Sequence, residues 1–167
     1  YWGLSASFSD IDNDGWPDLY VTNDFWSPDT FYHNNGDGTF ALIDASKIQQ
    51  TPMFAMGMDF GDINNDGLAD IYVCNAGPKG KLDTRNQLFV NQGQLKFKEE
   101  AKKYGLDDDA YSSQASFFDA DHDGDLDMFL SWGNLQENNL TNAGYSIASS
   151  TGDKAVIGFT FTSEDLA

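Results

Sequence analysis

Three short segments of the chain place carboxylates at alternate positions, a pattern by which one loop can surround a cation. Each segment reads Asp-x-Asp/Asn-x-Asp-Gly-x-x-Asp, and the three begin at Asp10, Asp62 and Asp119. Calcium takes roughly six to eight oxygen ligands at about 2.3–2.6 Å, and alternate carboxylates with a bend glycine can supply most of them. The pattern therefore predicts one calcium ion per loop, about three ions in all.

The predicted ligands occupy loop positions 1, 3, 5, 7 and 9, with position 7 contributing its backbone carbonyl. They are Asp10, Asp12, Asp14, Trp16 and Asp18; Asp62, Asn64, Asp66, Leu68 and Asp70; and Asp119, Asp121, Asp123, Asp125 and Asp127. Position 6 is glycine in each loop, where the chain must bend sharply. Because Asn64 replaces a carboxylate, the second loop is predicted to bind calcium most weakly.

Other metal sites fit the pattern less well. An EF-hand needs a glutamate at position 12 and a following helix, whereas these loops have Val21, Val73 and Leu130 there, each within an apolar run. Magnesium prefers one or two carboxylates and several retained waters. Zinc prefers histidine or cysteine, and the candidates His33, Cys74 and His122 do not cluster in the sequence. We expect Cys74 to be a small buried residue and His122, at position 4, to be exposed.

The elements around the loops are predicted to be short strands. Apolar, aromatic and β-branched runs follow each loop at residues 19–21, 71–73 and 128–130, and shorter runs precede it at 6–8, 57–60 and 115–117. The first two units continue with further strands at 30–34, 39–42, 87–91 and 95–97, joined by Asn- and Gly-rich turns. A short helical turn is expected within 98–104, ended by Gly105.

The spacing of the loops predicts a repeat architecture. Asp10, Asp62 and Asp119 are 52 and 57 residues apart, a period suited to a propeller blade of four short strands. We therefore predict an all-β fold of about three four-stranded antiparallel blades from an incomplete propeller. The expected units are 1–50, 51–105 and 106–167, the last being a third calcium loop with a degenerate blade or C-terminal extension. The Asn-rich residues 134–142 predict no hairpin partner, and a strand at 155–161 has no assigned blade.

Composition restricts the partners of the protein. The 27 acidic against 9 basic residues give a formal net charge of -18, which disfavours nucleic acid and anionic membranes because phosphate binding requires Lys and Arg. The 14% aromatic content indicates that the acidic residues belong to a folded domain. A single cysteine excludes an intrachain disulfide, and the sequence contains no apolar run long enough for a membrane span.

At these residues the chain resembles the FG-GAP or VCBS repeat family, the blades of integrin α-subunit-like propellers and of many secreted bacterial proteins. The resemblance rests on the motif Phe-x-Asp-x-Asp-x-Asp-Gly-x-x-Asp-Leu at 8–19, its copies at 60–71 and 117–128, and the stretch at 34–40. It implies calcium in the loop between the first two strands of each blade and an extracellular, cell-surface or periplasmic location. Since such propellers close with more blades than three, we expect the remaining blades in the same or another chain.

The resemblance implies a non-enzymatic interaction or scaffold module for adhesion, ligand binding or complex assembly, with a protein or glycan partner. The alternative is part of a propeller-fold carbohydrate-active enzyme or a lectin. No catalytic constellation is visible, because most acids belong to the loops and the run 107–109 is expected to be solvated. The tryptophans Trp2, Trp16, Trp26 and Trp132 are candidates for sugar stacking, although such residues more often pack between blades.

Overall fold

The computed structural model describes residues 2–25, 27–48, 51–77, 84–120, 122–133, 143–149 and 154–157. They form three antiparallel sheets, each of four strands. The first sheet comprises β1 (Trp2–Ser9), β2 (Asp18–Asp24), β3 (Thr30–Asn34) and β4 (Phe40–Leu42). The second comprises β5 (Ala55–Gly61), β6 (Asp70–Asn75), β7 (Gln87–Asn91) and β8 (Phe97–Glu99). The third comprises β9 (Tyr111–Phe118), β10 (Asp127–Gly133), β11 (Ala143–Ser149) and β12 (Lys154–Ile157).

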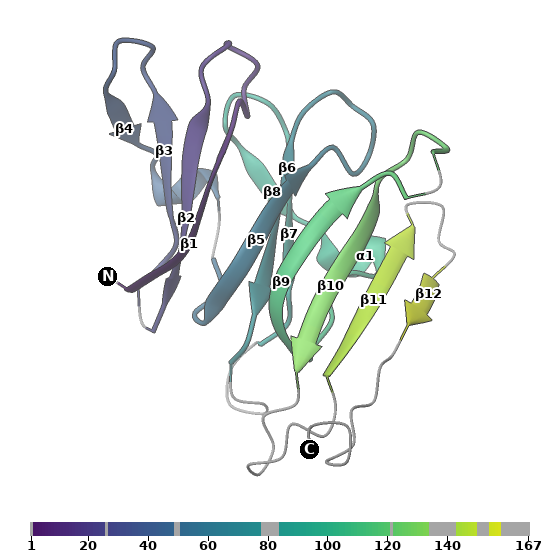
Figure 1. Cartoon of the computed structure of the whole chain (residues 1–167). Helices are drawn as coiled ribbons and strands as arrows, with labels where there is room; N and C mark the ends of the chain where they lie inside the picture. Colours follow the sequence, from purple (N-terminus) through teal and green to yellow (C-terminus); the bar gives the residue numbers. More distant parts are fainter. Residues whose placement is uncertain are drawn as a thin grey trace.

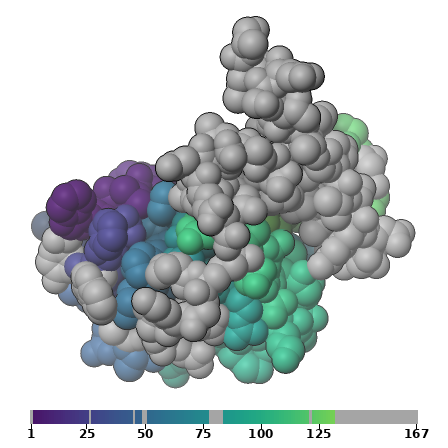
Figure 2. Space-filling model, turned by 90° about the horizontal axis from the view of Figure 1, so that it is seen from below, coloured from purple at the N-terminus to yellow at the C-terminus, as the bar shows by residue number. Residues whose placement is uncertain are grey.

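The all-β fold with four-stranded antiparallel sheets is thereby confirmed, and the sheets are consistent with propeller blades. Within the described residues the three sheets stand side by side and do not close into a ring (Figure 1). Seen from the end opposite the acidic loops, the purple first sheet and the green third sheet flank the second (Figure 2). No helix among the described residues is long and apolar enough to cross a membrane.

The third sheet differs from the expectation for its last two strands. The sequence predicted no hairpin partner after β10, but β11 pairs along β10 from Asp127↔Ser149 to Gly133↔Ala143, and β12 pairs with β11. The strand expected at 155–161 is therefore a member of the third sheet over Lys154–Ile157. Residues 134–142 and 158–161 lie outside the described residues. The sequence analysis missed this pairing because β11 carries small residues, Ala143-Gly144 among them, in place of the apolar run that marks β3 and β7.

The same register recurs in all three sheets. The phenylalanine two residues before the position-1 aspartate pairs with the first apolar residue of the second strand, as Phe8↔Leu19, Phe60↔Ile71 and Phe117↔Met128. Each acidic loop therefore connects two antiparallel strands, and the position-12 residues lie in β2, β6 and β10. This geometry confirms that the loops are not EF-hands.

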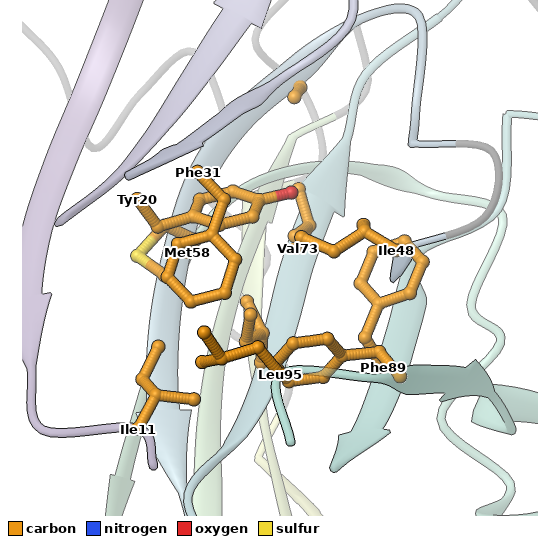
Figure 3. Packing of buried hydrophobic residues seen from close by; sticks show 11 residues of the cluster. Ile11, Tyr20, Phe31, Ile48, Met58, Val73, Phe89 and Leu95 are labelled. Atoms are coloured by element: carbon orange, nitrogen blue, oxygen red, sulfur yellow. The ribbon is translucent and has the colours of Figure 1, made fainter. Parts of the chain in front are cut away.

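Two apolar cores lie between the sheets, one between the first and second sheets and one between the second and third. The alternation of side chains along β6 sends Ile71 and Val73 into a cluster with the first sheet, and Tyr72 and Cys74 into a cluster with the third. Figure 3 shows the first cluster, where Tyr20 and Phe31 of the first sheet meet residues of the second. Cys74 is fully buried, as predicted, and burial raises the pKa of its thiol.

Short helical turns and one close backbone approach complete the packing. A 3-10 turn spans Ala45–Lys47, and α1 spans Ala101–Tyr104 and ends at Gly105, whose φ of 68° is the left-handed conformation expected there. Between the second and third sheets, a Cβ at Gly57 would lie 2.5 Å from the Ser113 carbonyl oxygen. Only glycine therefore lets β5 approach β9 at this point.

Candidate metal centre

All three acidic loops, 10–18, 62–70 and 119–127, lie at the same end of the sheets (Figure 1). We call them the first, second and third loops. Their backbones bend alike, because position 4 has a positive φ of 59° at Asn13, 57° at Asn65 and 62° at His122. The glycine two residues later has a φ of 91°, 86° and 91° in turn, a conformation that a side chain would strain. His122 is exposed, as predicted.

The aspartate at position 1 organises each bend by accepting hydrogen bonds from backbone N–H groups. In the first loop Asp10 accepts from Asp14 N (3.0 Å) and Gly15 N (2.9 Å). In the second loop Asp62 accepts from the equivalent groups at 3.0 and 2.8 Å. Asp119 accepts from Gly124 N at 3.1 Å in the third loop. The loop backbone is thus pre-formed by its own carboxylate.

The aspartate at position 9 is buried and ties the loop to the sheet. Asp70 is fully buried and accepts hydrogen bonds from Ile63 N (3.0 Å) and Asn91 N (2.8 Å). Burial raises its pKa to about 6, although the two N–H donors oppose that rise. Asp18 is equally buried and accepts from Ile11 N (3.4 Å) and Asn34 N (2.8 Å). Asp127 accepts from Ala120 N at 2.9 Å.

Three carboxylates of the first loop converge. Asp10, Asp12 and Asp14 each offer an oxygen within 4.8 Å of the others, a spacing that one cation can span. Asp12 Oδ1 is buried and has no hydrogen-bond donor among the described residues. Burial first, and then the charges of Asp18 and Asp14, raise the pKa of Asp12. A buried carboxylate oxygen without a donor fits a bound cation, because burying an uncompensated charge is costly.

Histidine 33 joins this group from β3. Its Nδ1 lies 3.0 Å from Asp18 Oδ1 and 3.6 Å from Asp12 Oδ2, and its Nε2 lies 4.0 Å from Asp14 Oδ2. Asp12, Asp18 and His33 therefore form a second group whose ligand atoms lie within 4.8 Å of one another. His33 does not cluster with Cys74 or His122 in the sequence, but in space it joins the aspartates of the first loop, a contact that the sequence analysis missed. The β2–β3 register could have revealed it, because Leu19↔Tyr32 pairing puts His33 opposite Asp18.

The second loop is closed by its own side chains. Asn64 Oδ1 accepts from Asp66 N, and Asn64 Nδ2 donates to Asp66 Oδ2, both at 3.0 Å. The residue equivalent to His33 is Val90, since Ile71↔Phe89 pairing puts it opposite Asp70. This loop therefore has one carboxylate fewer than the first, and an apolar residue stands at the position of the imidazole.

The third loop is described except for Asp121, which lies outside the described residues. Asp119 Oδ1 is buried and has no hydrogen-bond donor in the part of the chain that the structure describes. Asp123 Oδ1 accepts from Asp125 N at 2.9 Å, as the position-5 carboxylates accept from Trp16 N and Leu68 N in the other loops. The position-7 carbonyls of Trp16, Leu68 and Asp125 remain predicted ligands.

Hydrogen bonds link each loop to its neighbour. Asn13 Nδ2 donates to Gly67 O at 2.9 Å, and Asn65 Nδ2 donates to the Asp125 carboxylate at 2.7 Å. At the base of the loops, Asn91 Nδ2 donates to Ile11 O at 2.9 Å. The three loops therefore form one continuous acidic rim.

The structure describes the side chains of two tryptophans, and one of these residues belongs to the rim. Trp16 is at position 7 of the first loop and half exposed, and Trp2 on β1 is largely exposed. Trp132 lies in β10, and Trp26 is outside the described residues.

Comparison with known proteins agrees with the repeat. No curated protein matches the chain at a significant level. Residues 10–73 match the family described as FG-GAP-like repeat. This match runs from the first residue of the first loop to the position-12 residue of the second. Residues 10–73 of this acidic, all-β chain are therefore an FG-GAP-like repeat.

Proposed function

We propose that the chain is a calcium-binding interaction or scaffold module that acts outside the cytoplasm and has no catalytic activity of its own. Each loop holds one Ca²⁺ through the carboxylates at its alternate positions, the Asn64 side-chain oxygen and the position-7 carbonyl. The observation that carries the proposal is the convergence of Asp10, Asp12 and Asp14 around a buried Asp12 oxygen that lacks a donor. Hard oxygen donors in this number suit Ca²⁺ best.

Calcium in these loops would stabilise the rim of the molecule. In the absence of a cation, the carboxylates within 10–18 repel one another, and burial together with the charges of Asp18 and Asp14 raises the pKa of Asp12. A ligand that binds only the folded loop adds RT ln(1 + [L]/Kd) to the free energy of unfolding, about 2.7 kcal/mol at a concentration of 100 times Kd. The loops would then present a rigid surface for assembly.

The decisive experiment is calcium titration by calorimetry with chelator-treated protein, paired with thermal melting. We expect calcium to raise the melting temperature and Asp14→Ala to remove one site. The matched control is Asp37→Ala, because Asp37 is also an exposed turn aspartate that accepts a backbone N–H, from Thr39, but lies outside the loops. An identical melting transition with calcium and with chelator contradicts the proposal.

The partner that we propose is another blade of the same kind, from the same or another chain. Apolar side chains on the outer face of the first sheet are exposed: Phe8 by 61%, Phe40 by 43% and Leu42 by 63%. The residue equivalent to Phe8 in the second sheet, Phe60, packs against the core between the first two sheets. Within the described residues, no sheet covers the face that carries Phe8, whereas the first sheet covers Phe60, and exposed apolar faces of this kind mark interaction sites.

Sedimentation velocity tests whether this exposed face binds another blade. A second copy of the chain is the simplest source of that blade. We expect association that grows with concentration and is lost in the variant Phe8→Ser with Leu42→Ser. Phe118→Ser is the control, since Phe118 is an exposed aromatic residue on β9, at the opposite sheet. A chain that stays monomeric and binds an apolar dye equally with and without the two substitutions contradicts a docking face.

A further inference from the structure

The imidazole of His33 makes the first loop chemically different from a site built of oxygens alone. Its simplest role is a hydrogen bond from Nδ1–H to the buried Asp18, at 3.0 Å. However, Asp18 Oδ1 already accepts from Asn34 N, and Asp18 Oδ2 accepts from Ile11 N. Asp18 is therefore satisfied by the backbone on both oxygens, and each carboxylate oxygen still has a further lone pair.

The donor atoms are spaced as neighbouring ligands of a small divalent cation would be. Bonds of about 2.0–2.1 Å to nitrogen and oxygen place adjacent ligands roughly 2.9–3.4 Å apart in tetrahedral or octahedral geometry. His33 Nδ1 lies 3.0 Å from Asp18 Oδ1 and 3.6 Å from Asp12 Oδ2. Only small side-chain shifts are needed to contact one ion.

An independent observation also points to a cation ligand at this place. Asp12 directs Oδ2 toward His33, and its other oxygen is buried without a donor in the described part of the chain. The Asp12 side chain is only 20% exposed, so bulk water does not fully solvate its charge. A cation beside Asp12 would compensate that charge directly.

We infer that the first loop is a mixed-donor site that binds a borderline first-row divalent cation, of which Zn²⁺ is the probe, through Asp12, Asp18 and His33. The inference deepens the proposed function of the loops as cation sites. Imidazole nitrogen suits borderline cations better than it suits calcium, which prefers oxygen. Because Asp12 and Asp18 are also calcium ligands of the first loop as proposed, the zinc and calcium positions share two ligands and compete.

Binding at Nδ1 requires that His33 release the proton now shared with Asp18. The coordinating nitrogen must be deprotonated, so the neutral imidazole loses its Nδ1 proton to solvent and takes up a proton from solvent on Nε2, a change of tautomer without a change of charge. Nε2 lies 4.0 Å from Asp14 Oδ2, a carboxylate toward which an Nε2–H group can turn. Asp14 would then be a positioning residue for the imidazole.

The second loop supplies the contrast within the same chain. Val90 stands where the first sheet has His33, and Asn64 stands where it has Asp12. Both differences remove a donor that the inference requires. The second loop should therefore bind calcium without selecting zinc.

The test is Zn²⁺ titration by calorimetry of the chelator-treated chain, together with ¹H–¹⁵N spectra of its two histidines. We expect zinc to move the His33 imidazole signals to the Nε2–H tautomer and to leave His122 unmoved. His33→Val, which copies the second sheet, should weaken the tightest zinc site by about tenfold or more and calcium binding by less than about threefold. His122→Asn, which copies position 4 of the other loops, is the control and should change neither.

The outcomes separate this inference from the proposed function. If zinc leaves the His33 signals of the unaltered chain unchanged, the mixed-donor site is overturned, whether or not His33→Val folds. If His33→Val weakens calcium as much as zinc, the selectivity is overturned while calcium binding stands. If calcium fails to bind any loop but zinc still moves His33, the proposed function fails and the mixed-donor site survives.

Discussion

The first and second sheets have the same backbone plan but differ at three equivalent positions in how they carry charge. Asp12, Asp29 and His33 of the first sheet correspond to Asn64, Asn86 and Val90 of the second. Asn64 and Asn86 are tied by hydrogen bonds within their own blade or to the next, whereas Asp12 keeps a buried oxygen without a described donor. In the second sheet these polar side chains are satisfied by hydrogen bonds within the protein. In the first sheet, Asp12 retains an oxygen that is available to a cation.

This difference separates the positions that shape both loops alike from position 3, where the two loops differ in ligand charge. Positions 1, 6 and 9 are alike in both loops. The carboxylates at positions 1 and 9 accept hydrogen bonds from backbone N–H groups, whichever residue stands at position 3. The residue at position 3 changes the charge of the loop but not the bend of its backbone. Substitutions at the two kinds of position should therefore have different effects on stability and on affinity.

The largest effect is expected for the buried aspartates that both loops share. Asp70→Ala removes the acceptor for Ile63 N and Asn91 N inside the protein. Two unsatisfied buried donors should lower the free energy of unfolding by about 3 kcal/mol, measured by urea denaturation in chelator. Asp18→Ala should cost a similar amount. Asp66→Ala, at an exposed position of the same loop, is the control and should cost less than about 0.5 kcal/mol. Equal costs for Asp70→Ala and Asp66→Ala would remove the distinction between shaping and binding positions.

The next effect concerns Asp29, whose counterpart Asn86 is neutral. Asp29 accepts from Asn23 N (2.8 Å) and the Tyr20 hydroxyl (2.9 Å), and burial raises its pKa to about 7. The folded state thus binds a proton that the unfolded chain, with its ordinary aspartate pKa of 3.8, has released between these two values. Stability must therefore fall as the pH rises from about 4 to 7 and stay low above 7.

Asp29→Asn should remove that part of the pH dependence. The full linkage value of roughly 4 kcal/mol is an upper limit, and we expect the variant to be more stable than the unaltered chain by about 2 kcal/mol at pH 8. The gain should vanish near pH 4, where Asp29 is largely protonated. Urea denaturation at several pH values, with chelator present throughout, measures the difference in the free energy of unfolding between the two proteins. The titration of the loop carboxylates is common to both proteins and cancels in this difference. If the stability difference stays constant between about pH 4 and pH 8, the Asp29 carboxyl does not have a pKa raised by burial.

A reciprocal exchange at position 3 should have a smaller effect on stability and a clear effect on affinity. Asp12→Asn removes a buried charge, so the metal-free chain should become more stable by about 1 kcal/mol and bind calcium in the first loop about tenfold more weakly. Asn64→Asp should do the reverse in the second loop, because it adds a carboxylate and breaks the Asn64–Asp66 pair. If both variants lose calcium affinity, position 3 shapes the loop as well as binding the ion.

Local patterns in the sequence were sufficient for much of this structure. Strong apolar runs predicted β2, β3, β6 and β7, and the bend glycines marked loops whose φ values agree with a sharp turn. The same reasoning failed for β11, which has no apolar run, and for His33, which reaches its neighbours only through strand pairing. Contacts that depend on register or on the next sheet, such as Asn91 with Ile11, have no signal in a single short segment.

The smallest effect is expected at the contact that joins the two compared loops. Asn13 has a φ of 59° and donates to Gly67 O, so Asn13→Gly keeps the backbone conformation and removes only the side-chain bond. Because the bond is exposed, the free energy of unfolding should change by less than about 0.5 kcal/mol.

Removal of the Asn13–Gly67 bond should nevertheless uncouple calcium binding by the two loops. In an Asp14→Ala background, which empties the first loop, Asn13→Gly should leave calcium binding by the second loop unchanged. With an intact first loop it should weaken binding by the second, since an ordered first loop holds Gly67 in place through this bond. A calorimetric double-mutant cycle measures that coupling, and a value of zero means that the two loops bind independently despite their contact.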